Sequence, residues 1–383
     1  MKSTLPRLKL SAISACLAAG LLAGSVISSY HSVSAAATAS QAITIMMNGA
    51  LYTPESNPYV SKGTVYLPLR EISSALKAVV VWQSHTKKVI ITRPDQTIVL
   101  TLGKATVTRN GAEVKLSATP IVKESHVYVP FRAAAEILGA SVNWNSKSQT
   151  VDITHKLDFD TVIGVNSFYW LNRKNGQVFL AKPYDSQPNL LGAMNIDLQR
   201  FSTMKLASSG GVDQLIVEDY YGEPLLNTDV YTALIVKGAI VKQTKVHYWQ
   251  RYTPNVTFDG RHQVMTDGKA IFLLDATGKL TKEYDLVAMT GNDETFSVEG
   301  IGQTYALVRP NTTGLLTLID LETGDTTQIY KQLNAQEQEY AETNDVPYHG
   351  DHIKFESEKD GQLHFSYHSI FDNKDHMFSF KLK

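Results

Sequence analysis

The chain has 383 residues, of which 43% are hydrophobic and 19% are charged, and its formal net charge is −1. These values are typical of a globular protein with two or three domains, and they exclude a largely disordered chain. The near-neutral charge also argues against a general nucleic-acid binder, because such proteins carry a basic face.

The first 35 residues have the pattern of a secretory signal peptide. Lys2, Arg7 and Lys9 precede an apolar run over residues 10–27, and small residues lead to a predicted cut after Ala35. Loss of these three positive charges would change the net charge from −1 to −4. The sequence therefore predicts a secreted or extracellular, envelope-associated protein with no membrane span after the leader.

Cys16 is the only cysteine of the chain and lies inside this leader. A lipoprotein attachment at Cys16 and an uncleaved apolar anchor are the two alternatives to cleavage after Ala35. A chain cleaved after Ala35 would hold no cysteine, which excludes disulfide bonds and thiolate metal sites. Its stability must then come from the burial of apolar surface.

The strongest pattern is an internal repeat between residues 43–92 and residues 105–154. TVYLPLREISSALKAVVVW begins at residue 64 and HVYVPFRAAAEILGASVNW at residue 126, so the two segments align at a constant offset of 62 residues. A fixed offset over such a length indicates a duplicated unit. The positions that define it are Pro68, Arg70 and Trp82 in the first copy and Pro130, Arg132, Glu136, Gly139 and Trp144 in the second.

Each copy predicts a small α+β unit of strand, helix and hairpin. A proline ends the strand and opens the helix, where its missing N–H costs nothing. In the second copy Phe131, Ala134, Ala135 and Leu138 recur at helical spacing and form one apolar face. Gly139 ends that helix. Lys77 occupies the equivalent position in the first copy, so there the backbone is either strained by about 1 kcal/mol or the helix runs on.

The pattern V-Y-V-P-F-R-x-x-x-E-x-L-G-x-x-V-x-W, followed by x-V-x-I, resembles the copper amine oxidase N-terminal-like domain, also called the stalk domain. The resemblance covers residues 42–155 and implies two tandem copies of an accessory domain that holds neither copper nor a quinone cofactor. The catalytic signature of that family, T-x-x-N-Y-[DE], does not occur in this sequence. We therefore expect no amine oxidase activity and no cofactor.

The arginine and tryptophan of each copy allow two interpretations. Arg70 and Arg132 could contact an anion or a wall polymer, but a local role is favoured, with Arg132 pairing with Glu136 at i+4. Trp82 and Trp144 could be platforms for a carbohydrate, but strand alternation predicts that both point into the core.

Residues 156–383 predict an all-β, propeller-like domain. Short apolar or alternating runs recur between Gly, Asp and Asn residues, and the hairpins around Asp275–Gly278 and Asp320–Gly324 look alike. A spacing of about 45 residues leaves room for about five blades. An incomplete propeller and a β-sandwich are the alternatives. Residues 332–342 predict one polar, solvated helix with acidic residues Glu337, Glu339 and Glu342.

Candidate chemistry in this region is sparse. Tyr248, Trp249 and Tyr252 lie near a predicted strand end and form a weak candidate surface for stacking sugars or peptides. His349-Gly-Asp-His352 is the tightest group of metal-ligand types, and residues 291–294 and 372–375 partly resemble calcium loops, but turn chemistry is favoured over metal binding for all of these.

The sequence thus predicts a non-catalytic binding or scaffolding protein whose stalk presents the β-domain. A cell-wall polymer or an extracellular protein is the predicted partner. The alternative is an envelope hydrolase or lyase that acts on glycan or peptide through the β-domain.

Overall fold

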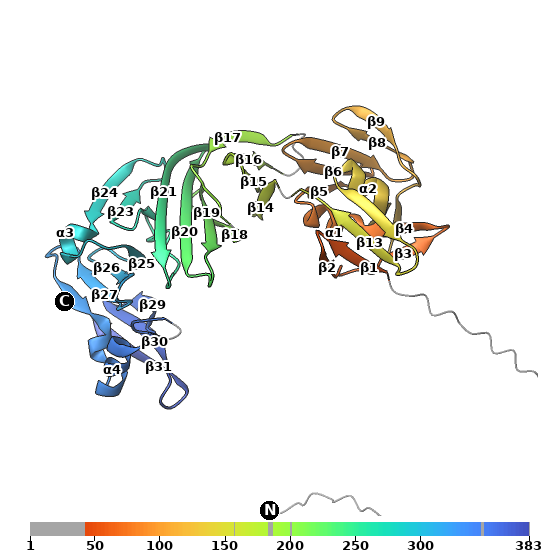
Figure 1. Ribbon diagram of the computed structural model, residues 1–383. Helices are drawn as coiled ribbons and strands as arrows, with labels where there is room; N and C mark the ends of the chain where they lie inside the picture. Colours follow the sequence, from red (N-terminus) through yellow and green to blue (C-terminus); the bar gives the residue numbers. More distant parts are fainter. Residues whose placement is uncertain (1–42, 157, 183–186, 200, 346–347, 383) are drawn as a thin grey trace, which may run out of the picture. The chain divides into compact units, whose positions relative to one another are not determined.

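A computed structural model describes residues 43–156, 158–182, 187–199, 201–345 and 348–382 (Figure 1). The predicted leader, residues 1–35, lies outside these residues. The described chain is mostly β-sheet with a few short helices. None of the helices in this part of the chain is both long and apolar enough to cross a membrane.

The N-terminal region, residues 43–156, contains three sheets and two helices. The sheets have the strand orders β12-β13-β1-β2, β10-β11-β4-β3 and β5-β6-β7-β8-β9. The elements are β1 (Thr44–Met47), β2 (Ala50–Tyr52), β3 (Tyr59–Ser61), β4 (Thr64–Pro68), α1 (Leu69–Ala75), β5 (Val79–Gln83), β6 (Lys88–Arg93), β7 (Gln96–Thr101), β8 (Thr106–Arg109), β9 (Ala112–Lys115), β10 (Ile121–Lys123), β11 (His126–Pro130), α2 (Phe131–Ile137), β12 (Ser141–Asn145) and β13 (Thr150–Thr154).

Equivalent elements of this region lie 62 residues apart and exchange partners. Strand β4 pairs with β11, so the two halves meet in one sheet. Strand β1 pairs in parallel with β13 of the other half, and β8 follows β7 in the third sheet. The buried residues of both halves belong to one hydrophobic cluster. The two halves therefore share a core.

The local turns follow the sequence signals. Asn48-Gly49 and Asn110-Gly111 have positive φ angles, as a type I′ hairpin turn requires. Pro68 and Pro130 are the N-cap residues of α1 and α2. Lys77 has a φ of 58°, so the backbone after α1 is left-handed. Of the two alternatives, strain at Lys77 therefore applies and a longer helix does not.

The predicted apolar face of α2 is confirmed, because Phe131, Ala134, Ala135 and Leu138 are all buried. The structure adds a feature of the helix ends that no local pattern indicated. Nη1 of the buried Arg93 donates to the carbonyl oxygens of Leu138 at 3.1 Å and Leu76 at 3.4 Å. These residues are the C-caps of the two helices, where a positive charge is favourable.

The C-terminal region, residues 158–382, contains five antiparallel sheets that follow one another in chain order. Each sheet is a meander of three or four strands. The first two are β14 (Phe159–Ile163), β15 (Phe168–Asn172), β16 (Gln177–Ala181) and β17 (Asn189–Ala193), then β18 (Phe201–Ser209), β19 (Val212–Tyr221), β20 (Asn227–Val236) and β21 (Ala239–Trp249). The third is β22 (Gln263–Thr266), β23 (Ala270–Leu274) and β24 (Leu280–Asp285), which α3 (Leu286–Thr290) follows.

The fourth sheet is β25 (Phe296–Ile301), β26 (Tyr305–Pro310), β27 (Thr317–Asp320) and β28 (Thr326–Gln328), and the fifth is β29 (Lys354–Lys359), β30 (Gln362–Ser369) and β31 (Lys374–Lys381). Between them lie the 3₁₀ helix η1 (Ile329–Gln332) and α4 (Ala335–Thr343). The two similar hairpins are present as β23-β24 and β27-β28. In both, the aspartate side chain accepts backbone N–H groups of its own turn, which explains the shared D-x-x-(x)-G pattern.

Candidate ligand-binding grooves

The three aromatic residues predicted as a stacking surface do not share one. Tyr248 is completely buried, and its hydroxyl contacts Asn255 and the carbonyl of Phe296. A buried ring offers no face to a ligand, so the predicted role of Tyr248 does not fit this geometry. Tyr252 is half-buried and donates to Glu218, whereas Trp249 is 51% exposed.

The N-terminal region instead presents two open grooves, one around Trp82 and one around Trp144. The prediction that Trp82 points into the core is wrong, because 40% of the residue is exposed. Trp144 is half-buried and packs against the edge of the core. Each tryptophan lies opposite a buried valine of the neighbouring strand, Val89 or Val151, so each groove has an apolar floor.

Groove A, around Trp82, has a volume of about 350 Å³. It is lined by Pro68, Leu69, Arg70, Val80, Trp82, Val89, Leu102, Val122, Ser125, His126 and Val127. Groove B, around Trp144, has a volume of about 490 Å³. It is lined by Val60, Gly63, Thr64, Val65, Ser117, Pro130, Phe131, Arg132, Val142, Trp144, Gln149 and Val151.

The two grooves are equivalent in sequence. Every lining residue of groove A except Leu102 has a counterpart in groove B at an offset of 62. Arg70 thus corresponds to Arg132 and Trp82 to Trp144. Two independent surface depressions would not select the same positions, so the grooves are a property of the repeated unit.

Each groove is completed by the other half of the region. Groove A takes its tryptophan and arginine from the first half but its opposite wall from the β10-β11 hairpin. Groove B takes its opposite wall from the β3-β4 hairpin. Neither half alone therefore forms a complete groove, because each depends on a hairpin of the other half.

The groove arginines are free to meet a ligand. Arg70 and Arg132 are the second residues of α1 and α2, and both are exposed. The predicted Arg132–Glu136 ion pair is absent, and within the described residues neither arginine forms an ion pair or a side-chain hydrogen bond. An exposed guanidinium beside an indole ring can hold a carboxylate while the ring packs against an apolar surface.

The residues of the two calcium-like segments have partners of their own. Among the described residues no three His, Cys, Asp or Glu side chains gather as a metal site requires. Asp372 bonds to His376 and Asp375 to His368, while Asp293 pairs with Lys269. The resemblance to calcium loops therefore reflects turns and local ion pairs.

The predicted solvated helix departs from expectation at one position. Glu337 of α4 is buried, although Glu342 is exposed and pairs with Lys331. The sequence of this polar segment has no apolar residues at helical spacing that would indicate an inward face. From α4, only Ala341 belongs to the hydrophobic cluster of this part of the chain.

Comparison with known proteins gives a family likeness for the N-terminal region only. No curated protein matches the chain. Similar solved structures include Hsv2 of Kluyveromyces lactis, with 10% identity and a TM-score of 0.24 over 79% of this chain and 98% of that chain. They also include apo AztD of Citrobacter koseri, with 8% identity and a TM-score of 0.24 over 66% of this chain and 85% of that chain.

Acylaminoacyl peptidase of Pyrococcus horikoshii shares 9% identity, with a TM-score of 0.25 over 85% of this chain and 44% of that chain. Scores this low carry no argument about fold or function. The family comparison is informative, and it covers both grooves: residues 46–153 match the copper amine oxidase N-terminal domain.

Proposed function

We propose that this protein is a secreted, non-catalytic binding protein that recognises an acidic polysaccharide of the cell envelope through grooves A and B. The observation that carries this proposal is the equivalence of the two grooves, each with one exposed arginine and one accessible tryptophan on an apolar floor. We also infer that the N-terminal region is a tandem pair of stalk domains and that the five C-terminal sheets form a propeller-like domain.

A repeating ligand fits two equivalent sites. When one chain carries two copies of a site, a polymer that reaches both binds more tightly than its single units do, because the second contact is intramolecular. A polysaccharide presents the same residue again and again, whereas a small metabolite gains nothing from the second groove. The duplication of the unit is thus accounted for by the nature of the ligand.

The chemistry of the lining selects an acidic sugar. The flat, apolar face of a sugar ring packs on an indole, and a carboxylate on the same ring accepts two N–H groups of a guanidinium. Because Arg70 and Arg132 are exposed, this electrostatic contribution should weaken as salt screens it. The predicted leader supports a place outside the cell membrane.

The proposal is tested by equilibrium binding of the full chain to an immobilised polymer of a uronic acid and to a neutral glucan of matched length. We expect binding to the uronic-acid polymer that weakens with rising salt, and little binding to the glucan. Trp82→Ala and Trp144→Ala should each weaken binding by about tenfold, because each removes an aromatic side chain that the bound ligand would cover.

Trp249→Ala is the matched control, because it removes an exposed tryptophan that lies outside both grooves. It should leave the affinity unchanged. Equal binding of both polymers would refute the role of the arginines. Loss of binding in Trp249→Ala, with the groove variants unaffected, would move the site to the C-terminal region.

A further inference from the structure

A cavity with a volume of about 560 Å³ lies in the C-terminal region. Its polar wall contains Arg251, Glu299, Arg309, Tyr348, His352 and Lys354. Volumes of several hundred Å³ are usual for small-molecule sites. Three of these residues are cationic and one is anionic at neutral pH, and the buried Asp351 adds a second negative charge next to Arg309.

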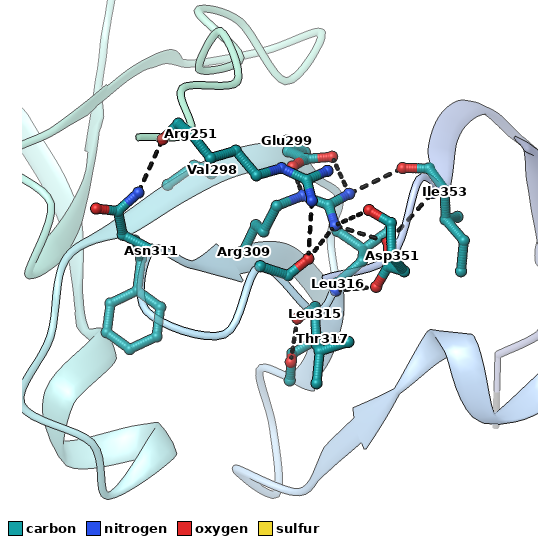
Figure 2. Close-up of polar contacts among 12 residues, drawn as sticks. Arg251, Val298, Glu299, Arg309, Asn311, Leu315, Leu316, Thr317, Asp351 and Ile353 are labelled. Atoms are coloured by element: carbon teal, nitrogen blue, oxygen red, sulfur yellow. Dashed lines mark hydrogen bonds and ion pairs between the residues drawn. The ribbon is translucent and has the colours of Figure 1, made fainter. Parts of the chain in front are cut away.

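Arg309 holds both acidic groups beside the cavity (Figure 2). Arg309 is completely surrounded by protein and holds Glu299 through Nε and Nη2 and Asp351 through Nη1 at 2.7 Å. The second oxygen of Asp351 accepts the backbone N–H of Leu316 at 2.6 Å. Both carboxylates therefore have hydrogen-bond partners, but one guanidinium leaves the pair with one excess negative charge, which a second cation nearby offsets.

Arg251 is that second cation. Its Nη1 donates to the carbonyl oxygens of His349 at 2.8 Å and Gly314 at 3.3 Å, which are neutral acceptors. Within the described residues it forms no ion pair and no other side-chain hydrogen bond. Burial and the charge of Arg309 lower the pKa of Arg251 to about 10, although the carboxylates of Asp351 and Glu299 act in the opposite direction. The guanidinium is thus charged at neutral pH and has unused donors.

Two further groups of the wall suit the same kind of ligand. Lys354 is exposed and has no ion-pair partner in the described part of the chain. His352 has a buried Nε2 atom without a hydrogen-bond partner, and its ring meets Tyr340 edge-on at 5.7 Å between centroids. Such an orphaned ring nitrogen is costly unless something completes it.

We propose that this cavity binds a small organic molecule through an oxyanion group, a carboxylate or a phosphate, that pairs with Arg251. The guanidinium offers two parallel N–H donors to such a group, and Lys354 adds a second positive charge. The site is separate from grooves A and B, so it does not depend on the proposed polysaccharide binding.

The first test uses the wild-type full chain with inorganic phosphate and with succinate as probes. At constant ionic strength set with chloride, we expect both probes to raise the unfolding temperature in a saturable manner. Comparison of the two probes shows whether phosphate or carboxylate is preferred. If neither raises the unfolding temperature above that in chloride, the proposal is wrong.

The second test locates the binding through the imidazole of His352, followed by NMR titration. Burial first, and then Arg251 and Arg309, lower the pKa of His352, while Asp351 and Glu337 act in the opposite direction. A bound anion offsets the two guanidinium charges, so the pKa of His352 should rise when phosphate is added. A pKa that does not change with phosphate would contradict binding at this cavity.

Variants separate Arg251 from general charge effects. Arg251→Gln should weaken phosphate binding by about tenfold or more, because it removes a charged donor. Arg251→Lys should retain part of the affinity, since it keeps the charge but loses the planar fork. Arg261→Gln, at an exposed arginine outside the cavity, is the matched control and should bind as the wild type does. Unchanged affinity in both Arg251 variants would overturn the assignment.

Discussion

At the scale of single residues, Arg93 and His155 form a contact at the point where the equivalent halves of the N-terminal region meet. They lie 62 residues apart, so they are equivalent positions of the repeat, and Nη1 of Arg93 is 3.0 Å from Nε2 of His155. Both side chains are buried. Arg93 also holds the ends of both helices, so this pair links the two units that build the grooves.

His155 makes stability depend on pH in a defined direction. Burial first, and then the charge of Arg93, lower the pKa of His155, although the carbonyl of Gly139 and the carboxylates of Asp158 and Asp95 oppose this. Because the unfolded chain then binds the proton more readily, the folded state is fully favoured above a pH of about 6.5 and loses stability as pH falls below it.

We therefore expect the free energy of unfolding of wild type to fall more steeply below a pH of about 6.5 than that of His155→Asn. Denaturant unfolding at a series of pH values measures this difference. His85→Asn, at an exposed histidine, is the control and should follow wild type. Parallel curves for wild type and His155→Asn would show that His155 is not held neutral.

At the scale of elements, helices α1 and α2 are both followed by a residue in the left-handed conformation, but the residue differs. Lys77 and Gly139 follow the C-caps of α1 and α2 at φ angles of 58° and 85°. Only glycine adopts this conformation without strain. A Cβ atom added at Gly139 would meet nothing within 4 Å, so the cost of a side chain there comes from the backbone alone.

This difference predicts opposite effects for a pair of exchanges. Lys77→Gly should raise the free energy of unfolding by about 0.5–1 kcal/mol, because it relieves the left-handed strain. Gly139→Ala should lower it by about 1 kcal/mol. Chemical denaturation measures both, and destabilisation by Lys77→Gly would mean that the lysine side chain has a role that its backbone angle does not reveal.

The elements also show what the sequence could predict. The prolines before both helices and the apolar face of α2 follow from spacing and local chemistry, and the structure bears these two predictions out. The exposure of Trp82 could not be predicted in this way. Strand alternation assigns each residue to one of two faces, but it does not show which parts of a face are covered by other segments. The β10-β11 hairpin, which belongs to the other half of the region, covers Trp82 only partly. No local pattern indicates that this hairpin lies there.

At the scale of the whole molecule, contacts between successive sheets are held by groups that no local pattern connects. Arg309 of β26 in the fourth sheet binds Asp351, which precedes β29 of the fifth sheet, and the carbonyl of Ile353 at 2.8 Å. Arg251 reaches Gly314 and His349 from the segment after β21. These residues are 42 or more positions apart, so no local pattern indicates the charge network or the cavity beside it.

Arg309 should therefore be among the residues most important for stability. Arg309→Met leaves Glu299 and Asp351 buried without their common partner, which typically costs about 3–5 kcal/mol. Thermal and denaturant unfolding measure the loss. The exposed control Arg261→Gln should remain near wild type, and a loss below about 1 kcal/mol in Arg309→Met would contradict the buried network.

If grooves A and B both bind the ligand, each chain has two binding sites. The number of binding sites per chain is therefore the most direct test. Isothermal titration of the full chain with a uronic-acid oligosaccharide too short to span both grooves gives that number. We expect two sites of similar affinity for wild type, one for Trp82→Ala, one for Trp144→Ala, and none for the double variant. A wild-type chain with one site or none, or single variants that keep two, would contradict it.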